Sequence, residues 1–307
     1  MHDITLHHYE LSPFSQKMRS LLGYTELPWN AVLTSPMLPR PLLAPLTGGY
    51  RRIPVAQLGA DIYCDTRVIA RKIAQQSQHH ELFPEHHRTQ IEELAAWADS
   101  TLLMLCVAYV GKSRYSVNLL RYFNPLELPK FFLDRVRLMA GANTRAMMPG
   151  NIERELQRFL GDFEQALAAG FRFGATPTIA DFALYHPLWL TCEIARVPLL
   201  DPYPAVARWM QRISDFGDGA ATPTTATQAL AIATQAEPVP VAQTVPGYSD
   251  ELINKRISIT PDDYGLVPVT GQLIYADQHE SILRCQHVDL GTLHLHFPRQ
   301  GFVLKAH

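Results

Sequence analysis

Residues 4–24 read ITLHHYELSPFSQKMRSLLGY, and they contain the clearest strand and helix signals of the amino-terminal part. Its first half, Ile4 to Tyr9, is rich in β-branched and aromatic residues and predicts a strand. Ser12 followed by Pro13 is typical of a helix start, where serine caps the helix and proline takes the first position. The sequence therefore predicts a strand that runs directly into a helix.

The alternation of strands and helices continues to about residue 78. A strand is predicted near Trp29 to Leu33, and a helix from Thr66 to about Gln76. Between them, two apolar runs flank Gly59-Ala60-Asp61, which is typical of a hairpin. Strands that alternate with helices predict a small mixed sheet with helices on its faces. We therefore expect an α/β domain over residues 1–78.

The pattern changes to a helical period over residues 86–216. Apolar residues such as Ile91, Leu94 and Ala98 recur at steps of three and four. Further helices are predicted over 151–167, 179–195 and 205–216, each bounded by Gly or Pro. This part is expected to be an all-α domain.

The carboxyl-terminal part differs again. Residues 217–246 are dominated by Ala, Thr, Gln and Pro and contain few large apolar side chains, so we expect a linker. Residues 247–307 contain short apolar stretches separated by turn residues, which predict strands. The expected fold class is α/β plus all-α, with a small all-β, barrel-like module at the end.

Charge and cysteine usage exclude several classes of function. The 307 residues carry a formal net charge of −2, which offers no basic surface for nucleic acid or an anionic membrane. The four cysteines lie far apart and form no CxxC pair, so neither a zinc site nor a disulfide framework is indicated. We expect neither a nucleic-acid partner nor a membrane partner.

The expected location is the cytoplasm. Met1-His2-Asp3 lacks the basic start and long apolar segment of a secretory signal. The richest apolar stretch, around Thr101 to Val110, is too short to span a bilayer.

Histidines near the end of the chain raise the question of a metal site. His294 and His296 share one face of a predicted strand, with His287 and Asp289 nearby. The opposite, apolar face of this strand carries Leu293, Leu295 and Phe297. We favour solvent-facing histidines over metal ligands and expect no metal.

Four local motifs, in the same order and with similar spacing, resemble the glutathione transferase family. They are Ser12-Pro13-Phe14-Ser15-Gln16-Lys17-Met18-Arg19, Arg52-Ile53-Pro54-Val55, Tyr63-Cys64-Asp65-Thr66-Arg67-Val68-Ile69 and Thr178-Ile179-Ala180-Asp181. The resemblance covers the first 216 residues. It implies a thioredoxin-like amino-terminal domain, a helical second domain, a homodimer and glutathione as substrate. The module over residues 247–307 lies outside the resemblance.

The resemblance implies that Ser12 activates the glutathione thiol. A free thiol has a pKa near 8.5, and attack on an electrophile needs the thiolate. At a helix start, the dipole and a donated hydroxyl hydrogen bond favour an anion. Two alternatives stay open. Ser12 only caps the helix, or the thiol is activated by Tyr9, since other classes of the family use a tyrosine there.

Main-chain binding of glutathione is also implied by the resemblance. Pro54, whose counterpart is cis in the family, would turn the backbone of Ile53 toward the cysteinyl part of the peptide. Phe14, within the same motif as Ser12, belongs to the expected binding site.

The two ends of the peptide are expected to meet polar residues. Asp65 and Thr66 stand where the family usually has Glu-Ser, and would bind the γ-glutamyl ammonium and carboxylate. Helix capping explains them equally well. Arg51 or Arg52 would meet the glycyl carboxylate, although loop arginines are commonly just solvated.

An electrophile pocket is expected between the two domains, lined by Trp97, Met104 and Tyr109. Core packing explains these three residues equally well. The first hypothesis for function is therefore a transferase that binds glutathione and activates its thiol toward a small electrophile. The sequence does not identify this electrophile, or distinguish conjugation, isomerisation and peroxide reduction.

The second hypothesis is a non-catalytic binding or assembly protein. It would keep the transferase fold as a scaffold, while residues 247–307 recruit an unknown protein partner. A trans Ile53–Pro54 bond, or a groove filled by the protein's own side chains, would contradict the first hypothesis.

Overall fold

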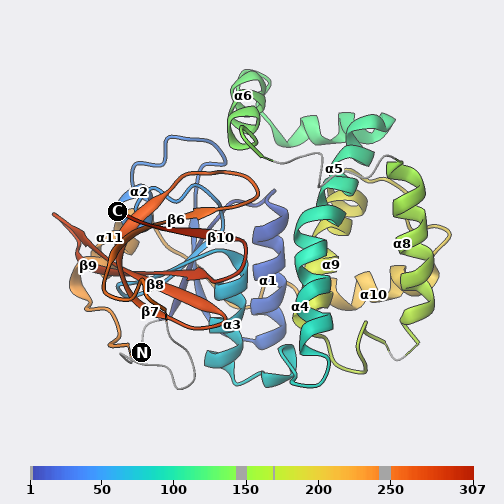
Figure 1. Ribbon diagram of the computed structural model, residues 1–307. Helices are drawn as coiled ribbons and strands as arrows, with labels where there is room; N and C mark the ends of the chain where they lie inside the picture. Colours follow the sequence, from blue (N-terminus) through green and yellow to red (C-terminus); the bar gives the residue numbers. More distant parts are fainter. Residues whose placement is uncertain (1–2, 143–150, 169, 242–249) are drawn as a thin grey trace.

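The computed structural model describes residues 3–142, 151–168, 170–241 and 250–307. Its described part has a sheet half and a helical half, with helix α1 between them (Figure 1). The amino-terminal elements are β1 (Ile4–His8), α1 (Pro13–Thr25), β2 (Trp29–Leu33), α2 (Ala44–Thr47), β3 (Val55–Leu58), β4 (Asp61–Cys64), α3 (Thr66–Ser77) and η1 (His80–Leu82). The predicted strand-to-helix start and the hairpin are confirmed.

Helix α1 begins where the sequence predicts. Pro13 takes the first position, and the Ser12 hydroxyl accepts a hydrogen bond from the Ser15 backbone N–H at 3.2 Å. Most of the helix is buried, polar residues such as Lys17 included, because α1 lies between the sheet and the helical half (Figure 1).

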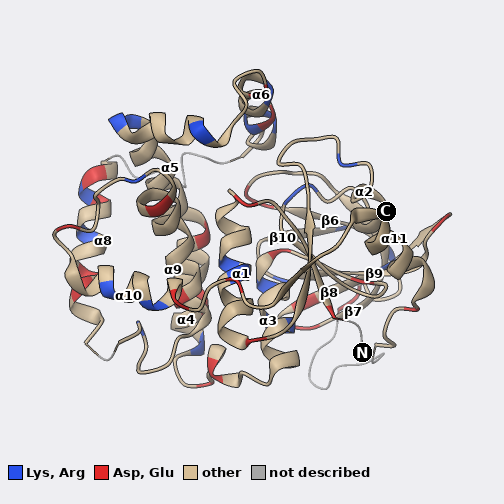
Figure 2. Cartoon of the chain, turned by 180° about the vertical axis from the view of Figure 1, so that it is seen from behind, with Lys and Arg blue, Asp and Glu red and all other residues tan. Residues whose placement is uncertain are grey.

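The helical half confirms the predicted all-α domain. Its elements are α4 (Arg88–Trp97), η2 (Ala98–Leu102), α5 (Leu103–Lys112), η3 (Arg114–Tyr122), α6 (Leu128–Leu138), α8 (Ile152–Ala166), α9 (Ile179–Trp189), η4 (Leu190–Ile194) and α10 (Pro204–Ser214). Helix α9 starts at a capping box in which Asp181 accepts from the Thr178 backbone N–H at 2.8 Å. Basic and acidic residues are interspersed over these helices (Figure 2).

Elements α4, η2 and α5 form one continuous helix, Arg88–Lys112, which is longer than the apolar stretch seen in the sequence. By length and composition it is apolar enough to cross a membrane. Its inward face, including Ile91, Ala98 and Leu102, is buried in the core of the helical half. A helix buried in a protein core can meet the same criteria of length and composition as a helix that spans a membrane.

The carboxyl-terminal strands continue the amino-terminal sheet. They are β6 (Arg256–Pro261), β7 (Val269–Ala276), β8 (Glu280–His287), β9 (Gly291–Pro298) and β10 (Phe302–Ala306). Strand β9 pairs in parallel with β4, and Ile62 lies opposite Leu295. One ten-stranded sheet results, in the order β10-β6-β7-β8-β9-β4-β3-β1-β2-β5. The predicted β module is confirmed, but it is part of this sheet and not a separate barrel, because the edge of β4 offers unpaired backbone groups.

The predicted linker requires correction in its described part. Strand β5 (Ala221–Pro223) pairs with β2, and helix α11 (Ala226–Gln235) follows it. Ala229 and Ala233 are fully buried, because their small side chains allow α11 to pack closely. The end of the predicted linker and the first residues of the module, 242–249, lie outside the described residues.

Two apolar clusters share the sheet. Along β4, Ile62 belongs to one cluster and Tyr63 to the other, because successive side chains of a strand point to opposite faces. The first cluster joins the sheet to α1 and the helical half. The second joins it to the carboxyl-terminal strands, with Leu283, Leu295 and Phe297 fully buried. The added strands therefore complete the core of the amino-terminal domain.

Candidate functional site

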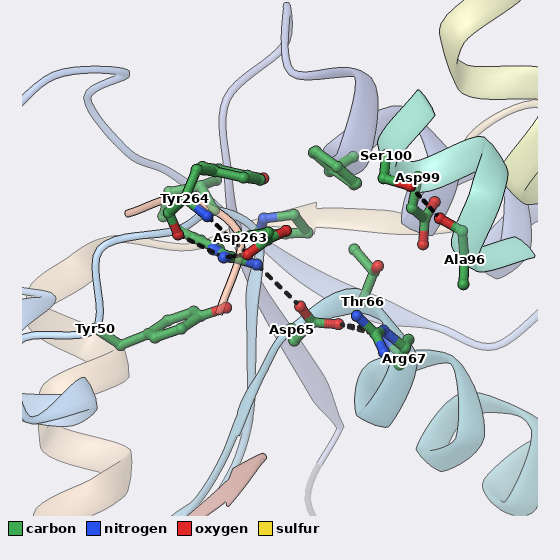
Figure 3. Close-up of a pocket in the computed structure, with 13 residues that line it drawn as sticks. Tyr50, Asp65, Thr66, Arg67, Ala96, Asp99, Ser100, Asp263 and Tyr264 are labelled. Atoms are coloured by element: carbon green, nitrogen blue, oxygen red, sulfur yellow. Dashed lines mark hydrogen bonds and ion pairs between the residues drawn. The ribbon is translucent and has the colours of Figure 1, made fainter. Parts of the chain in front are cut away.

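A small cavity lies where three parts of the chain meet: the start of α3, the segment before β3, and η2. Its free volume is about 50 Å³. The loop between β6 and β7 closes its fourth side with Asp263 and Tyr264 (Figure 3). The cavity is lined by Phe14, Tyr50, Arg52, Ile53, Pro54, Asp65, Thr66, Arg67, Ala96, Asp99, Ser100, Asp263 and Tyr264.

The segment before β3 supplies the main-chain side of the cavity. The Ile53–Pro54 peptide bond is cis, as the resemblance implies. Ile53 and Pro54 both line the cavity, and Phe14 reaches it from the first turn of α1. The ring of Phe14 lies 4.9 Å from the ring of His186, centroid to centroid, so helix α9 supports it from behind.

The start of α3 supplies a carboxylate and a hydroxyl. Asp65 caps the helix by accepting from the Arg67 backbone N–H at 3.0 Å, and its φ is +104°. Thr66 lines the cavity, and its hydroxyl accepts from Lys17 Nζ at 3.4 Å. The structure thus brings both predicted residues to the cavity and also gives Asp65 the capping role.

A buried charge network lies under Thr66. Lys17 Nζ donates to both carboxylate oxygens of Asp99, at 2.7 and 2.9 Å, and His186 Nε2 lies 3.0 Å from one of them. Burial disfavours the charged form of Asp99, but Lys17 and His186 outweigh it and lower its pKa to about 2. Asp99 is therefore a fixed anion at the wall of the cavity. Sequence reasoning missed it, although Asp99 is the only Asp or Glu between Leu94 and Gly111, and this isolation within an apolar stretch was an available signal.

Two carboxylates and a backbone carbonyl surround the Arg52 guanidinium, while its Nε is buried without a hydrogen-bond partner among the described residues. Arg52 forms ion pairs with Asp263 and, at 3.7 Å, with Asp65, and it donates to the Tyr264 carbonyl at 2.5 Å. Its guanidinium also lies 4.0 Å from the centre of the Tyr264 ring. Sequence reasoning missed Asp263 and Tyr264, because no local signal links a loop so distant in the chain to Arg52.

The two predicted thiol-activating residues do not line this cavity. Ser12 is only 2% exposed and caps α1. Helix capping is one of the two alternatives to thiol activation by Ser12. Tyr9 packs against the second apolar cluster.

The predicted electrophile-pocket residues also lie elsewhere. The ring of Trp97 packs on Phe159, with centroids 5.0 Å apart, and Tyr109 packs against the core of the helical half. Met104 is half-buried and does not line the cavity. Ala96, Asp99 and Ser100 of the same long helix face the cavity instead (Figure 3).

The histidines of β9 are buried, and the expectation that they face solvent was wrong. His296 lies between two carboxylates, with Nε2 3.0 Å from Asp61 and Nδ1 2.7 Å from Glu280. His294 Nδ1 lies 3.6 Å from Asp61. The pairing of β9 with β4 brings these groups together. Over the residues that the structure describes, no cluster of His, Cys, Asp or Glu has the arrangement of a metal site.

Burial disfavours a charged His296, but Asp61 and Glu280 outweigh it and raise the pKa of this histidine. The same pairing holds the pKa of Asp61 well below its usual range, against the effect of its burial. The histidine–carboxylate cluster therefore joins β4 to the added strands by charge as well as by backbone hydrogen bonds.

The fold and the cavity define a class: a thioredoxin-like domain with a cis proline before its third strand, followed by an all-helical domain. Residues 6–81 match the family model for the glutathione S-transferase N-terminal domain. Residues 134–212 match the family model for the glutathione S-transferase C-terminal domain. The crystal structure of a GST-like protein from Pseudomonas syringae matches with 32% identity and a TM-score of 0.80, over 100% of both chains. The chain belongs to the glutathione S-transferase family.

Two further solved structures match a smaller part of this chain. FzlA from C. crescentus matches with 21% identity and a TM-score of 0.49, over 69% of this chain and 88% of its own. A glutathione S-transferase from Methylobacillus flagellatus KT with GSH bound matches with 19% identity and a TM-score of 0.47, over 70% of this chain and 99% of its own. No curated protein matches the chain.

Proposed function

We propose that this protein binds glutathione at the cavity beside Pro54 and activates its thiol for attack on a small electrophile. The observation that carries the proposal is convergence. Residues from three separate motifs, Phe14, the Arg52–Pro54 segment and Asp65–Thr66, line one cavity. Membership of the family and the cis proline at the main-chain side of this cavity support glutathione as the substrate. The proposed reaction assigns no step to a metal.

The proposed thiol activation rests on the start of α1. The Ser12 oxygen accepts from the Ser15 backbone N–H, so its own proton stays free to be donated. Because Ser12 is 2% exposed and lies outside the cavity lining, this proton can reach a thiolate sulfur only if peptide binding uncovers the hydroxyl. Lowering the thiol pKa by about two units requires about 2.7 kcal/mol of differential stabilisation. One charge-assisted hydrogen bond and the helix dipole together supply energies of this size. Tyr9 is the rival hydroxyl in this proposal.

Glutathione can enter only if the loop carrying Asp263 and Tyr264 moves. Ligand sites for small molecules usually enclose about 300 to 1,000 Å³, whereas this cavity has about 50 Å³. The loop belongs to the added strands, so outward movement of this loop would open the site without rearranging Pro54 or α3.

We test the proposal by retention on immobilised glutathione, followed by ultraviolet titration of the thiolate of bound glutathione. The bound thiol should titrate about two units below 8.5. Ser12→Ala should return this pKa toward 8.5 and cost about 1 kcal/mol of stability from lost capping. Tyr9→Phe is the matched control that removes the rival hydroxyl. An unshifted thiol in the unmodified protein would contradict activation.

A second candidate function is a non-catalytic scaffold whose added strands recruit a protein partner. The pairing of Arg52 with Asp263 and the small cavity favour it, because the site already holds side chains of the protein. Absence of glutathione binding in the same experiment would select this candidate.

Family membership also supports a cytoplasmic homodimer. Light scattering should give a mass twice the 34.6 kDa of one chain. A monomeric mass at micromolar concentration would contradict this assembly.

A further inference from the structure

We propose that Asp263, a residue of the added carboxyl-terminal strands, determines which thiol peptides the site accepts. Its carboxylate holds Arg52 and thereby disfavours peptides with a free terminal carboxylate at that end. The preferred ligand is a glutathione-type peptide whose glycyl end is neutral, as an ester or an amide. This inference rests on the proposed function, because it assumes that a thiol peptide binds beside Pro54.

The contacts of Arg52 are the first argument. Its side chain is 10% exposed, and Asp65 and Asp263 both pair with its guanidinium. The Tyr264 carbonyl accepts from the same terminal nitrogen that pairs with Asp263. An incoming carboxylate therefore has to displace Asp263 before it can reach this terminal nitrogen, Nη2. The other terminal nitrogen, Nη1, already lies 3.7 Å from Asp65, and Nε is buried without a hydrogen-bond partner in the part of the chain that the structure describes.

The charge balance of the cavity is the second argument. Arg67, the other arginine of the lining, lies 3.6 Å from Asp65 and donates to the Gln300 carbonyl at 3.0 Å. Asp99, on the opposite wall, is neutralised from beneath by Lys17. Each arginine of the lining thus already has a carboxylate partner. A ligand with one more carboxylate adds uncompensated negative charge in a largely buried space.

The anchoring of the loop is the third argument. Gly265 donates a backbone hydrogen bond to the Leu138 carbonyl at the end of α6, at 2.8 Å. On the other side of the loop, the Asp262 backbone N–H donates to the Gly301 carbonyl at 3.1 Å. Between these anchors, the Asp263 oxygen that accepts from the Tyr264 backbone N–H at 2.8 Å also accepts from Arg52.

A neutral glycyl end changes the competition. The loop must still give way for any peptide, because the cavity is small. Movement of the loop separates Asp263 from Arg52. With an ester or amide at the glycyl end, Asp263 can pair with Arg52 again once the peptide has entered. With a free carboxylate, one anion must leave Arg52 or share it.

The test compares binding of glutathione and of its glycyl monoethyl ester by calorimetry. The full-length protein is used unmodified, as Asp263→Asn and as Asp262→Asn. Asparagine is nearly isosteric with aspartate and still accepts from the Tyr264 backbone. Asp262 is exposed in the same loop, so its substitution changes the net charge equally without touching Arg52.

The unmodified protein should bind the ester more tightly than glutathione. Asp263→Asn should strengthen glutathione binding about tenfold, the scale of one charge-assisted hydrogen bond, and change ester binding less than about twofold. Asp262→Asn should leave the ratio of the two affinities unchanged. A melting curve checks the fold of each variant, and Asp263→Ser serves if Asp263→Asn does not fold.

Three results would overturn the inference. The first is binding of both peptides with the same affinity ratio in the unmodified protein and in Asp263→Asn. The second is an equal effect of Asp262→Asn, which would reflect net charge alone. The third is no binding of either peptide to any form of the protein, and only this result also rejects the proposed function.

Discussion

At the scale of single residues, Lys17 shows how the site is supported from beneath. Its side chain is 1% exposed and pairs with Asp99, whose side chain is 12% exposed. Lys17→Met should lower the unfolding free energy by about 3 to 5 kcal/mol, because the buried Asp99 carboxylate loses Lys17 and keeps only His186 as a side-chain partner. Denaturant unfolding measures this loss.

The matched control for Lys17 is Arg88→Met. Arg88 pairs with Glu85, whose side chain is 83% exposed, so the loss should stay within about 0.5 kcal/mol. Equal losses in the two variants would show that the Lys17–Asp99 pair contributes no more than a surface pair.

At the scale of elements, α1 depends on a close approach at Gly23. A Cβ there would lie 2.3 Å from the Gly217 carbonyl oxygen and 2.4 Å from that of Phe216. Gly23→Ala should therefore destabilise the protein by about 1 to 3 kcal/mol through overpacking. Gly161 of α8 has no atom within 4 Å of its added Cβ, so Gly161→Ala should stabilise the protein by about 0.5 to 1 kcal/mol. The melting temperature should fall in Gly23→Ala and rise in Gly161→Ala. A shift in the same direction in both variants would contradict the close approach at Gly23.

The junction of β4 and β9 should respond to pH through His296. Asp61 and Glu280 raise the pKa of His296 above 6.5, so its stabilising contribution is complete below about pH 6.5 and is lost as the pH rises through the folded value. Asp61 has a lowered pKa, so its contribution is present above about pH 4 and is lost on acidification. The junction should be strongest between these limits.

The measurement is the difference in unfolding free energy between the unmodified protein and His296→Gln. This difference should shrink from pH 6 to pH 9. The exposed His86→Gln is the control, and its difference should stay near zero throughout. A difference for His296→Gln that does not change with pH would show that the histidine is not charged in the folded protein.

At the scale of the whole molecule, one sheet joins the amino-terminal domain to the added strands, so we expect the two parts to unfold together. Leu295 is fully buried in a cluster with Val55 and Ile62. Leu295→Ala should cost about 2 to 5 kcal/mol, with a single unfolding transition for tryptophan fluorescence and circular dichroism. Val303→Ala, at a side chain that is 56% exposed, should change stability little. Early, separate loss of the strands would contradict a shared core.

Much of the fold and part of the site followed from local signals. Ser12-Pro13, the turn at Gly59-Ala60-Asp61 and the Thr178–Asp181 box each act within a few residues, so they specify where elements begin and end. The Asp65–Thr66 pair was recognisable for the same reason. Helix α11 escaped prediction because an Ala-rich stretch resembles a linker until a partner surface is known.

From the sequence alone one can derive the order of strands and helices in the amino-terminal domain, the family of the first two domains and the strand character of the tail. Three features became visible only in the folded protein: β9 adds to β4, Asp263 contacts Arg52, and Lys17 pairs with Asp99 under Thr66. The two groups of features differ in the sequence distance over which their interactions act. Capping, turns and periodicity act over a few residues, whereas strand pairing and burial of charge depend on which distant segments share the same interior.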